Sequence, residues 1–455
     1  MESSSDAALV APCVAFVTLG CAKNEADTAR MRVRLAEAGF LIEDDPAEAD
    51  AVVVNTCSFI QSATEESIEA VFDAAGMPNV AAGAPLIVAG CMPARYGEEL
   101  ADELVEARAF VPCSREDDIA AIVADALGVD APGGGAAASV TLSASGGAAE
   151  VEGSRAALAA LPAAPFAYVK ISDGCDRFCT YCTIPYIRGR YRSFPLDDVR
   201  AEVAAKVAAG VREIVLIAQD TGRWGTDFEE PSTLAALVGA LAEEHPGTWF
   251  RVMYLQPEGL TDEYLEAVAA HPNVCDYFDI PLQHVDAGIL RAMNRTGSRG
   301  EFEELLARVR RRIPDATLRT TLIAGFPGET DGQFEELCAF VEDAGFDYVG
   351  VFPYSREEGT RAFDLPGQVD EDEKADRAQR LRDVADAVCA PRVAERIGRT
   401  LDVLVEGREE DGQLFGRAMC QAPEVDGVTY LEDGEVGQVV RVTIGDTLLY
   451  EMEGA

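Results

Sequence analysis

The sequence predicts an α/β protein in three parts: a doubly wound parallel sheet, a (βα)6-type barrel and a small all-β barrel. Three observations lead to this fold class. At 455 residues the chain is too long for one ordinary domain. Short apolar runs alternate with helical patterns in two successive arrays, which is typical of parallel sheets. From about residue 397 the pattern changes to a period of two, which indicates antiparallel strands.

The first array, residues 12–128, predicts the doubly wound sheet. Helical patterns such as Asn24–Ala38 and Gln61–Ala75 separate its apolar runs, which are Val14–Leu19, Ala51–Val54, Leu86–Ala89 and Ala109–Val111. Residues 129–160 then lose all pattern and are rich in Ala, Gly and Ser. This composition predicts a flexible linker, and the alternative for its end is a helix near Ser154–Leu161.

The second array, residues 161–392, predicts the barrel, because six strand-plus-helix units follow one another. The expected strands are Phe166–Ser172, Glu213–Ala218, Trp249–Leu255, Tyr277–Pro281, Leu318–Ala324 and Tyr348–Pro353. A long charged helix, about Glu371–Arg396, ends this part. Residues 393–455, with alternating runs at Leu401–Val405 and Val439–Ile444, predict the small all-β barrel.

Composition limits the partners and the compartment. With 38 basic and 80 acidic residues the net charge is −42, which repels phosphate backbones and attracts basic partners, although solubility alone is an alternative explanation. The acidic start, Met1–Asp6, lacks the basic region of a signal peptide, and no continuous apolar run approaches the ~18 residues of a membrane span. We therefore expect a cytoplasmic protein without a membrane span. In that reducing compartment its twelve cysteines indicate metal binding or catalysis rather than disulfides.

Cys175, Cys179 and Cys182 lie in one loop directly after the first expected barrel strand, with spacing Cys-x3-Cys-x2-Cys. The carboxyl ends of barrel strands are where active sites lie. Three close thiolates suit a 4Fe-4S cluster and leave one iron open for a ligand. The spacing is the signature of enzymes that bind S-adenosyl-L-methionine at that iron. The alternatives are buried free thiols or a zinc site, although structural zinc normally takes four protein ligands.

A second group of cysteines follows successive strands of the first array. Cys21, Cys57 and Cys91 come after the first, second and third expected strands. In a parallel sheet these strand ends share one edge, so the three thiols converge and a second 4Fe-4S cluster is expected. The alternative is three cysteines that only fill space in the core. Cys113 follows the fourth strand and can approach the same edge, but we assign it no metal role.

The two cysteine groups, in this order and with this tail, resemble the methylthiotransferase family of radical-SAM enzymes. Further matching stretches are Gly20–Asn24, Ala218–Thr221, Asp279–His284 and Tyr354–Thr360. The resemblance implies an N-terminal methylthiotransferase domain, a radical-SAM barrel and a C-terminal TRAM domain. It also implies two 4Fe-4S clusters, S-adenosyl-L-methionine, a sulfur donor, and an electron donor such as flavodoxin or ferredoxin. The chain departs from the family pattern in having Ala22 for Pro, Trp224 for Tyr, and a cysteine at position 113.

Within the family, the resemblance is to members that modify an aspartate β-carbon of small-subunit ribosomal protein twelve, free or on the ribosome. The alternative is a methylthiotransferase acting on a tRNA adenosine. Residues 392–455 contain six basic and fourteen acidic residues, whereas an RNA-binding barrel is expected to show a basic stripe. A basic ribosomal protein is the better electrostatic match.

Polar residues and glycines at other strand ends are expected near S-adenosyl-L-methionine. Gln219 and Asp220 follow the second barrel strand, and Gly325 and Glu329 follow the fifth. The alternatives are helix capping or loop solvation for the polar side chains, and an ordinary strand-to-helix turn for Gly325–Thr330. No catalytic side chain is assigned beyond the clusters.

Overall fold

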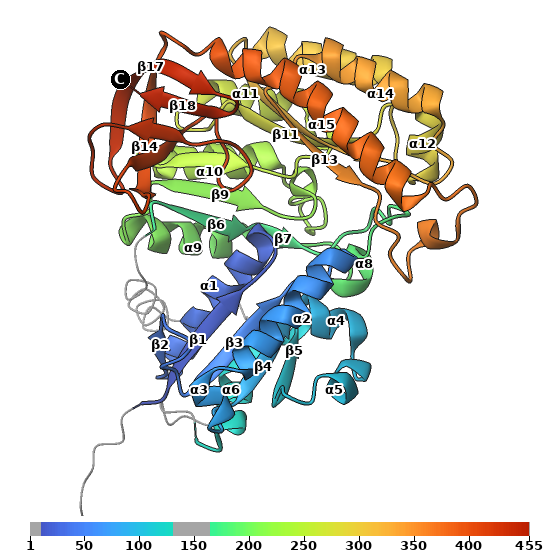
Figure 1. Ribbon diagram of the computed structural model, residues 1–455. Helices are drawn as coiled ribbons and strands as arrows, with labels where there is room; N and C mark the ends of the chain where they lie inside the picture. The colour runs from blue at the N-terminus through green and yellow to red at the C-terminus, as the bar shows by residue number, and fades with distance from the viewer. Residues whose placement is uncertain (1–10, 131–163, 455) are drawn as a thin grey trace, which may run out of the picture. The chain divides into compact units, whose positions relative to one another are not determined.

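The computed structural model of the protein describes residues 11–130 and 164–454, which form two compact units (Figure 1). The first unit contains the described residues up to 130 together with Tyr186–Arg188, and the second unit contains the remainder. The linker predicted over 129–160 lies, from residue 131 onward, outside the described residues. Among the described helices, none has the length and apolarity needed to cross a membrane.

A five-stranded parallel sheet forms the centre of the first unit, in the order β2-β1-β3-β4-β5. Four of these strands were predicted, and β2 was missed because it is a three-residue edge strand that begins with an exposed leucine. The strands are β1 (Cys13–Thr18), β2 (Leu41–Glu43), β3 (Ala51–Thr56), β4 (Leu86–Gly90) and β5 (Ala109–Pro112).

Both faces of this sheet are covered by helices, as predicted for a doubly wound sheet (Figure 1). In β3, Ala51 and Val53 pack with the core under α1 (Ala22–Glu37) and α6 (Ile119–Leu127). Val52 and Val54 pack on the opposite side with α2 (Gln61–Ala75). Short helices α3 (Pro78–Ala81), α4 (Cys91–Tyr96) and α5 (Glu99–Glu103) complete the unit. Because side chains on both faces are buried, only the strand ends can present polar chemistry.

The six predicted barrel strands are all present in the second unit. They form two parallel three-stranded sheets, β6-β9-β10 and β11-β12-β13. The two sheets adjoin where Phe250 of β10 bridges to Val274, just before β11, and where Leu255 N donates to Asp279 O of β11. The strands are β6 (Phe166–Lys170), β9 (Glu213–Ile217), β10 (Trp249–Val252), β11 (Tyr277–Gln283), β12 (Thr317–Ala324) and β13 (Tyr348–Pro353).

Helices between these strands bury their apolar sides against the sheets (Figure 1). They are α9 (Leu196–Ala208), α10 (Leu234–Glu244), α11 (Asp262–Ala270), α12 (Ala287–Ala292), α13 (Arg299–Arg312) and α14 (Asp331–Ala344). The long charged helix predicted near Glu371–Arg396 is α15 (Glu371–Ala394), which packs along β12 and β13.

A closed five-stranded barrel ends the second unit, in the order β14-β15-β16-β18-β17, and confirms the predicted all-β tail. The two alternating runs lie in β14 (Thr400–Arg408) and β17 (Val439–Leu448). The sequence did not predict β15 (Leu414–Ala418), β16 (Thr429–Leu431) and β18 (Glu451–Gly454), because each is too short to show a period of two.

A buried charge network joins this small barrel to the parallel strands of the same unit. Glu213, which begins β9, accepts from Arg251 of β10 at 2.7 Å and from Arg417 of β15 at 2.6 Å. Arg417 also pairs with Glu406 of β14. Burial raises the pKa of the Glu213 carboxyl, but the two guanidiniums outweigh burial and hold the pKa below its ordinary value.

We predict that Arg417→Met destabilises the second unit strongly. The substitution leaves the Glu213 and Glu406 carboxylates without a shared cation in a buried site, a loss of about 3–5 kcal/mol in the free energy of unfolding. Urea denaturation measures the loss. The control is Arg441→Met, because Arg441 pairs with Asp402 on the surface and should contribute little. Equal stability of the two variants would contradict the importance of the network.

The Glu213 carboxylate also makes stability depend on pH. Its folded pKa is depressed, so its contribution is complete above the unfolded pKa of about 4.3 and is lost as the pH falls through the folded pKa. We therefore expect Glu213→Gln to be less stable than the unsubstituted protein at pH 7, and the gap to narrow as the pH is lowered toward 3. If urea titrations gave the same difference in stability at every pH, the charge of Glu213 would not be its cause.

Candidate iron–sulfur cluster sites

The structure brings Cys21, Cys57 and Cys91 to one edge of the first unit's sheet. Cys21 directly precedes α1, Cys57 directly follows β3, and Cys91 begins α4 directly after β4. The strands before them, β1, β3 and β4, are parallel neighbours, so their carboxyl ends adjoin. Gly20 has φ +101°, and a Cβ there would lie 2.5 Å from the Cys57 Cβ, so only glycine allows this approach.

Asn24 connects the loops that carry these three cysteines. Its buried Nδ2 donates to Leu19 O at 2.8 Å and to Thr56 O at 3.0 Å, which are the carbonyls just before the Cys21 and Cys57 loops. Its Oδ1 accepts from the Cys91 thiol at 3.8 Å. One side chain therefore fixes the spacing of all three strand ends.

Cys113 also reaches this edge, as its place after β5 suggested. A hydrogen bond with the Cys113 thiol lowers the pKa of Cys91, although burial of Cys91 acts in the opposite direction. The same hydrogen bond and burial raise the pKa of Cys113. Burial raises the pKa of Cys57 to about 12. Metal binding at Cys57 would therefore have to displace a tightly held proton from its thiol.

The second cysteine group lies in a loop of the second unit, and a pair of short strands closes the base of this loop. The short antiparallel strands β7 (Ser172–Asp173) and β8 (Arg192–Ser193) pair at that base. Gly174 has φ +75°, and a Cβ there would lie 2.2 Å from Arg190 O, so the turn into Cys175 requires glycine. Two bonds tie the loop down: Thr180 N donates to Met293 O, and Asn294 Nδ2 donates to Arg177 O.

Two arginines hold this loop against the carboxyl ends of the barrel strands. The Arg177 Nε lies 2.5 Å from Asp220 after β9, and its Nη1 lies 3.0 Å from Glu258 after β10. Arg295 donates to Pro281 O in β11 at 2.8 Å, and its Nη1 lies 4.0 Å from the Cys179 Sγ. The cysteine loop is therefore fixed relative to three successive strands.

Polar groups without partners lie beside the loop. Both polar atoms of the Gln219 side chain are buried and have no hydrogen-bond partner among the described residues. The same holds for the Asp220 Oδ1, whereas its Oδ2 pairs with Arg177. Burial raises the pKa of the Asp220 carboxyl, against the opposing effect of that guanidinium. Such orphaned atoms are costly unless a ligand completes their hydrogen bonds, so they fit a polar cofactor.

Backbone strain gathers at this same edge. Among the described residues, six other than glycine have positive φ, and four of them lie in or near the cysteine loop or at strand ends. Phe178 lies in the loop, Tyr254 follows β10, Gln283 ends β11, and Asn294 follows α12 and donates to the Arg177 carbonyl. Residues in this conformation cost of order 1–3 kcal/mol each and concentrate at functional sites.

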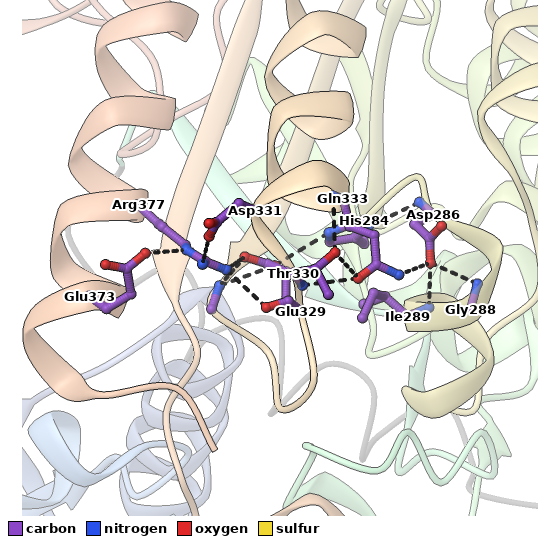
Figure 2. Close-up of polar contacts among 11 residues, drawn as sticks. His284, Asp286, Gly288, Ile289, Glu329, Thr330, Asp331, Gln333, Glu373 and Arg377 are labelled. Carbon is purple, nitrogen blue, oxygen red and sulfur yellow. Dashed lines mark hydrogen bonds and ion pairs between the residues drawn. The ribbon is translucent and has the colours of Figure 1, made fainter. Parts of the chain in front are cut away.

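Figure 2 shows how the loop after β12 is held. Gly325 N donates to both carboxylate oxygens of Glu329 at 3.1 Å, and Arg377 of α15 lies 2.9 Å from the same carboxylate. His284 Nε2 lies 3.4 Å from Glu329 Oε2 but is not aligned for a hydrogen bond. Glu329 is thus occupied by its own loop and positions it.

Gly325 has a close neighbour within the protein. With φ +75°, a Cβ at this position would lie 2.6 Å from the Lys374 Cγ of α15. Packing against α15 therefore already requires a glycine here, independently of any cofactor.

Both donor sets consist of cysteine thiols, the usual protein ligands of iron–sulfur clusters. Among the described residues, no three His, Cys, Asp or Glu side chains are arranged to hold one metal ion. A four-iron cubane separates its ligands more widely, because each thiolate binds a different iron. The first site presents Cys21, Cys57 and Cys91, with Cys113 bonded to Cys91. The second presents three thiols and unpartnered polar atoms, so both fit the groups expected from the sequence.

Known proteins are similar in sequence over nearly the whole chain. Residues 169–341 match the Radical SAM superfamily, residues 397–455 match the TRAM domain, and residues 13–112 match the Uncharacterized protein family UPF0004. The ribosomal protein uS12 methylthiotransferase RimO of Trichlorobacter lovleyi is 41% identical, covering 96% of this chain and 97% of that protein. RimO of Geobacter sulfurreducens is 42% identical, covering 97% and 98%.

The chain belongs to the RimO family of radical-SAM methylthiotransferases. This family uses S-adenosyl-L-methionine and two 4Fe-4S clusters. Among solved structures, the radical S-adenosylmethionine methyltransferase TsrM of Kitasatospora setae has a TM-score of 0.54 at 15% identity, covering 78% of this chain and 77% of that one. At that identity the likeness shows a shared fold only.

Two departures from the RimO pattern are structurally conservative. Ala22 is the first residue of α1, the helical position where proline and alanine are both well accommodated. Trp224 is buried and donates its Nε1 hydrogen to Phe194 O at 3.0 Å. Neither change disturbs a cysteine loop.

Several residues that shape the sites were not singled out from the sequence. Arg177 and Asn24 lie within the motifs themselves, but nothing in the motifs indicates which carbonyls or carboxylates they contact. Arg295 lies more than a hundred residues from Cys179 and carries no sequence signal.

The unpartnered amide of Gln219 gives a test of cofactor contact. We expect Gln219→Leu to raise the stability of the cofactor-free protein by about 1 kcal/mol, because a buried unsatisfied amide is removed, and to weaken S-adenosyl-L-methionine binding about tenfold. Thermal denaturation and equilibrium dialysis measure the two effects. Gln379→Leu, at an exposed amide that donates to Asp383, should change neither. Unaltered cofactor affinity in Gln219→Leu would show that this amide only lines the loop.

Proposed function

We propose that this protein installs a methylthio group on the β-carbon of an aspartate in ribosomal protein uS12. The observation that carries the proposal is the presence of two separate groups of three cysteines, each at the carboxyl ends of parallel strands. Cys21, Cys57 and Cys91 would hold one 4Fe-4S cluster, and Cys175, Cys179 and Cys182 the other. The relatives named RimO, at 41–42% identity over nearly the whole chain, support the same activity.

The protein's part in this chemistry is to position and shield. When bound at the second cluster, S-adenosyl-L-methionine supplies the carbon radical that removes the substrate hydrogen. Arg177 and Asn294 fix the cysteine loop against the strand ends. Gln219 and Asp220 offer unpartnered polar atoms to the cofactor, and Glu329 holds the Gly325 turn beside it.

A protein substrate suits the C-terminal barrel better than tRNA does. Each of the six arginines in residues 392–455 already has a partner in the chain. Five pair with carboxylates and Arg408 donates to Gly412 O; the five are Arg392, Arg396, Arg399, Arg417 and Arg441. A phosphate backbone would have to compete with these carboxylates, whereas a basic ribosomal protein meets an acidic surface. We further propose that the protein works in the cytoplasm. It would need a sulfur donor and an electron donor such as flavodoxin or ferredoxin.

The two cysteine groups separate two steps that can be assayed independently. The triple variant Cys21→Ala, Cys57→Ala, Cys91→Ala should still cleave S-adenosyl-L-methionine to 5′-deoxyadenosine but form no product. The triple variant Cys175→Ala, Cys179→Ala, Cys182→Ala should do neither. With the unsubstituted enzyme, uS12 should gain about 46 Da in mass spectrometry, since a methylthio group replaces hydrogen.

The competing function is tested in the same experiment by offering tRNA instead of uS12. If digested tRNA contained a modified adenosine while uS12 in parallel reactions stayed unmodified, the proposal would be wrong and the tRNA alternative would hold. Full activity of the first triple variant would refute the assigned role of Cys21, Cys57 and Cys91.

A further inference from the structure

A buried guanidinium reaches the first group of cysteines. Arg188, which belongs to the first unit, has a side chain only 1% exposed. Its Nη1 lies 2.9 Å from Asp27 Oδ2, a carboxylate equally buried. Its Nη2 lies 3.0 Å from the Asn24 Oδ1 and 3.6 Å from the Cys91 Sγ.

The two ends of the guanidinium therefore have different tasks. The Nη1 end forms the ion pair with Asp27, which is what makes burial of this charge tolerable. The Nη2 end faces the amide that spans the strand ends and the thiol of Cys91. Arginine suits this arrangement, because its planar fork presents several donors in fixed directions, whereas lysine presents a single nitrogen.

Metal binding changes the role of the sulfur. A free Cys91 thiol donates its hydrogen to Asn24 Oδ1, at 3.8 Å. A coordinated Cys91 is a thiolate, which has no hydrogen to donate and can only accept. The Arg188 Nη2 then faces an acceptor at hydrogen-bonding distance for sulfur. Hydrogen bonds to the sulfur ligands of a cluster withdraw charge and raise its reduction potential.

We propose that Arg188 donates an N–H···S hydrogen bond to the Cys91 ligand of the first cluster and raises the reduction potential of that cluster. The inference rests on the proposed assignment of Cys21, Cys57 and Cys91 to a 4Fe-4S cluster. Arg188 is a positioning residue, since it acts through Cys91. It also connects the cluster to the segment Tyr186–Arg188, which lies shortly after Cys182 in the sequence.

A purely structural role is the alternative, in which Arg188 only anchors its own segment through Asp27. That role accounts for the Nη1 contact and requires nothing of the Cys91 sulfur. The two roles differ in one measurable quantity, the reduction potential, which an anchor alone does not change.

The experiment uses the full-length chain with Cys175→Ala, Cys179→Ala and Cys182→Ala, so that only the first cluster gives a signal. In this background we expect Arg188→Lys to keep the ion pair with Asp27, lose the contact to sulfur, and shift the cluster to a more negative potential. A redox titration followed by electron paramagnetic resonance measures the shift. The control Arg34→Lys lies in the last turn of α1, at the opposite end from Cys21, and should leave the potential unchanged.

A second variant guards against misfolding of the first. Arg188→Met combined with Asp27→Leu removes both buried charges together, which is tolerated better than the removal of one. It should show the same negative shift. Potentials equal to the control in both variants, with full iron content, would overturn the role of Arg188. Absence of a 4Fe-4S spectrum from the background protein itself would instead refute the cluster assignment, and the inference with it.

Discussion

Parallel strands bring all their carboxyl ends to one edge of a sheet, and both cysteine sites depend on this constraint. In the first unit, successive residues of β3 such as Val53 and Val54 are buried on opposite faces, so both faces of the sheet are occupied by apolar packing. The strand ends are the places left for polar chemistry. Cys57 and Cys91 lie 34 positions apart in the sequence, yet each begins the segment after its strand, and the strands are neighbours.

The same constraint explains why the two sites are stabilised differently. In the first unit the cysteines come from three separate loops, and the Asn24 side chain connects them. It bonds to a carbonyl just before the Cys21 loop, to another just before Cys57, and to the Cys91 thiol. In the second unit the cysteines share one loop, and the task is to hold that loop against the strands. Arg177 of the loop pairs with the carboxylates of Asp220 and Glu258, and Asn294, which follows α12, donates to the Arg177 carbonyl. Burial strengthens the Asn24 bond to Thr56 O and the pairing of Arg177 with the buried Asp220 carboxylate, because water competes less for these groups.

Much of this arrangement could be predicted from the sequence, because it follows from local patterns. Apolar runs separated by helices predict parallel strands. A cysteine just past each run is then expected at the carboxyl edge of the sheet. The remainder depends on contacts between distant residues. Glu329 and Gly325 were expected near the cofactor from their loop alone, but their nearest partners, Arg377 and Lys374, belong to α15, about fifty positions later. Whether the loop also contacts the cofactor is a question that the sequence could pose but not decide.

The distribution of charged residues between the core and the surface bears on the choice of substrate. Every buried arginine in the network around Glu213 is matched by carboxylates of the same unit, so each internal pair removes one positive and one negative charge from the surface balance. The excess of 42 negative charges must therefore be carried by the groups that remain outside such pairs. A tRNA approaching this surface would meet repulsion at long range, and its phosphates would find the tail's arginines already engaged. A cation-rich protein meets the opposite field, which speeds its encounter with the enzyme.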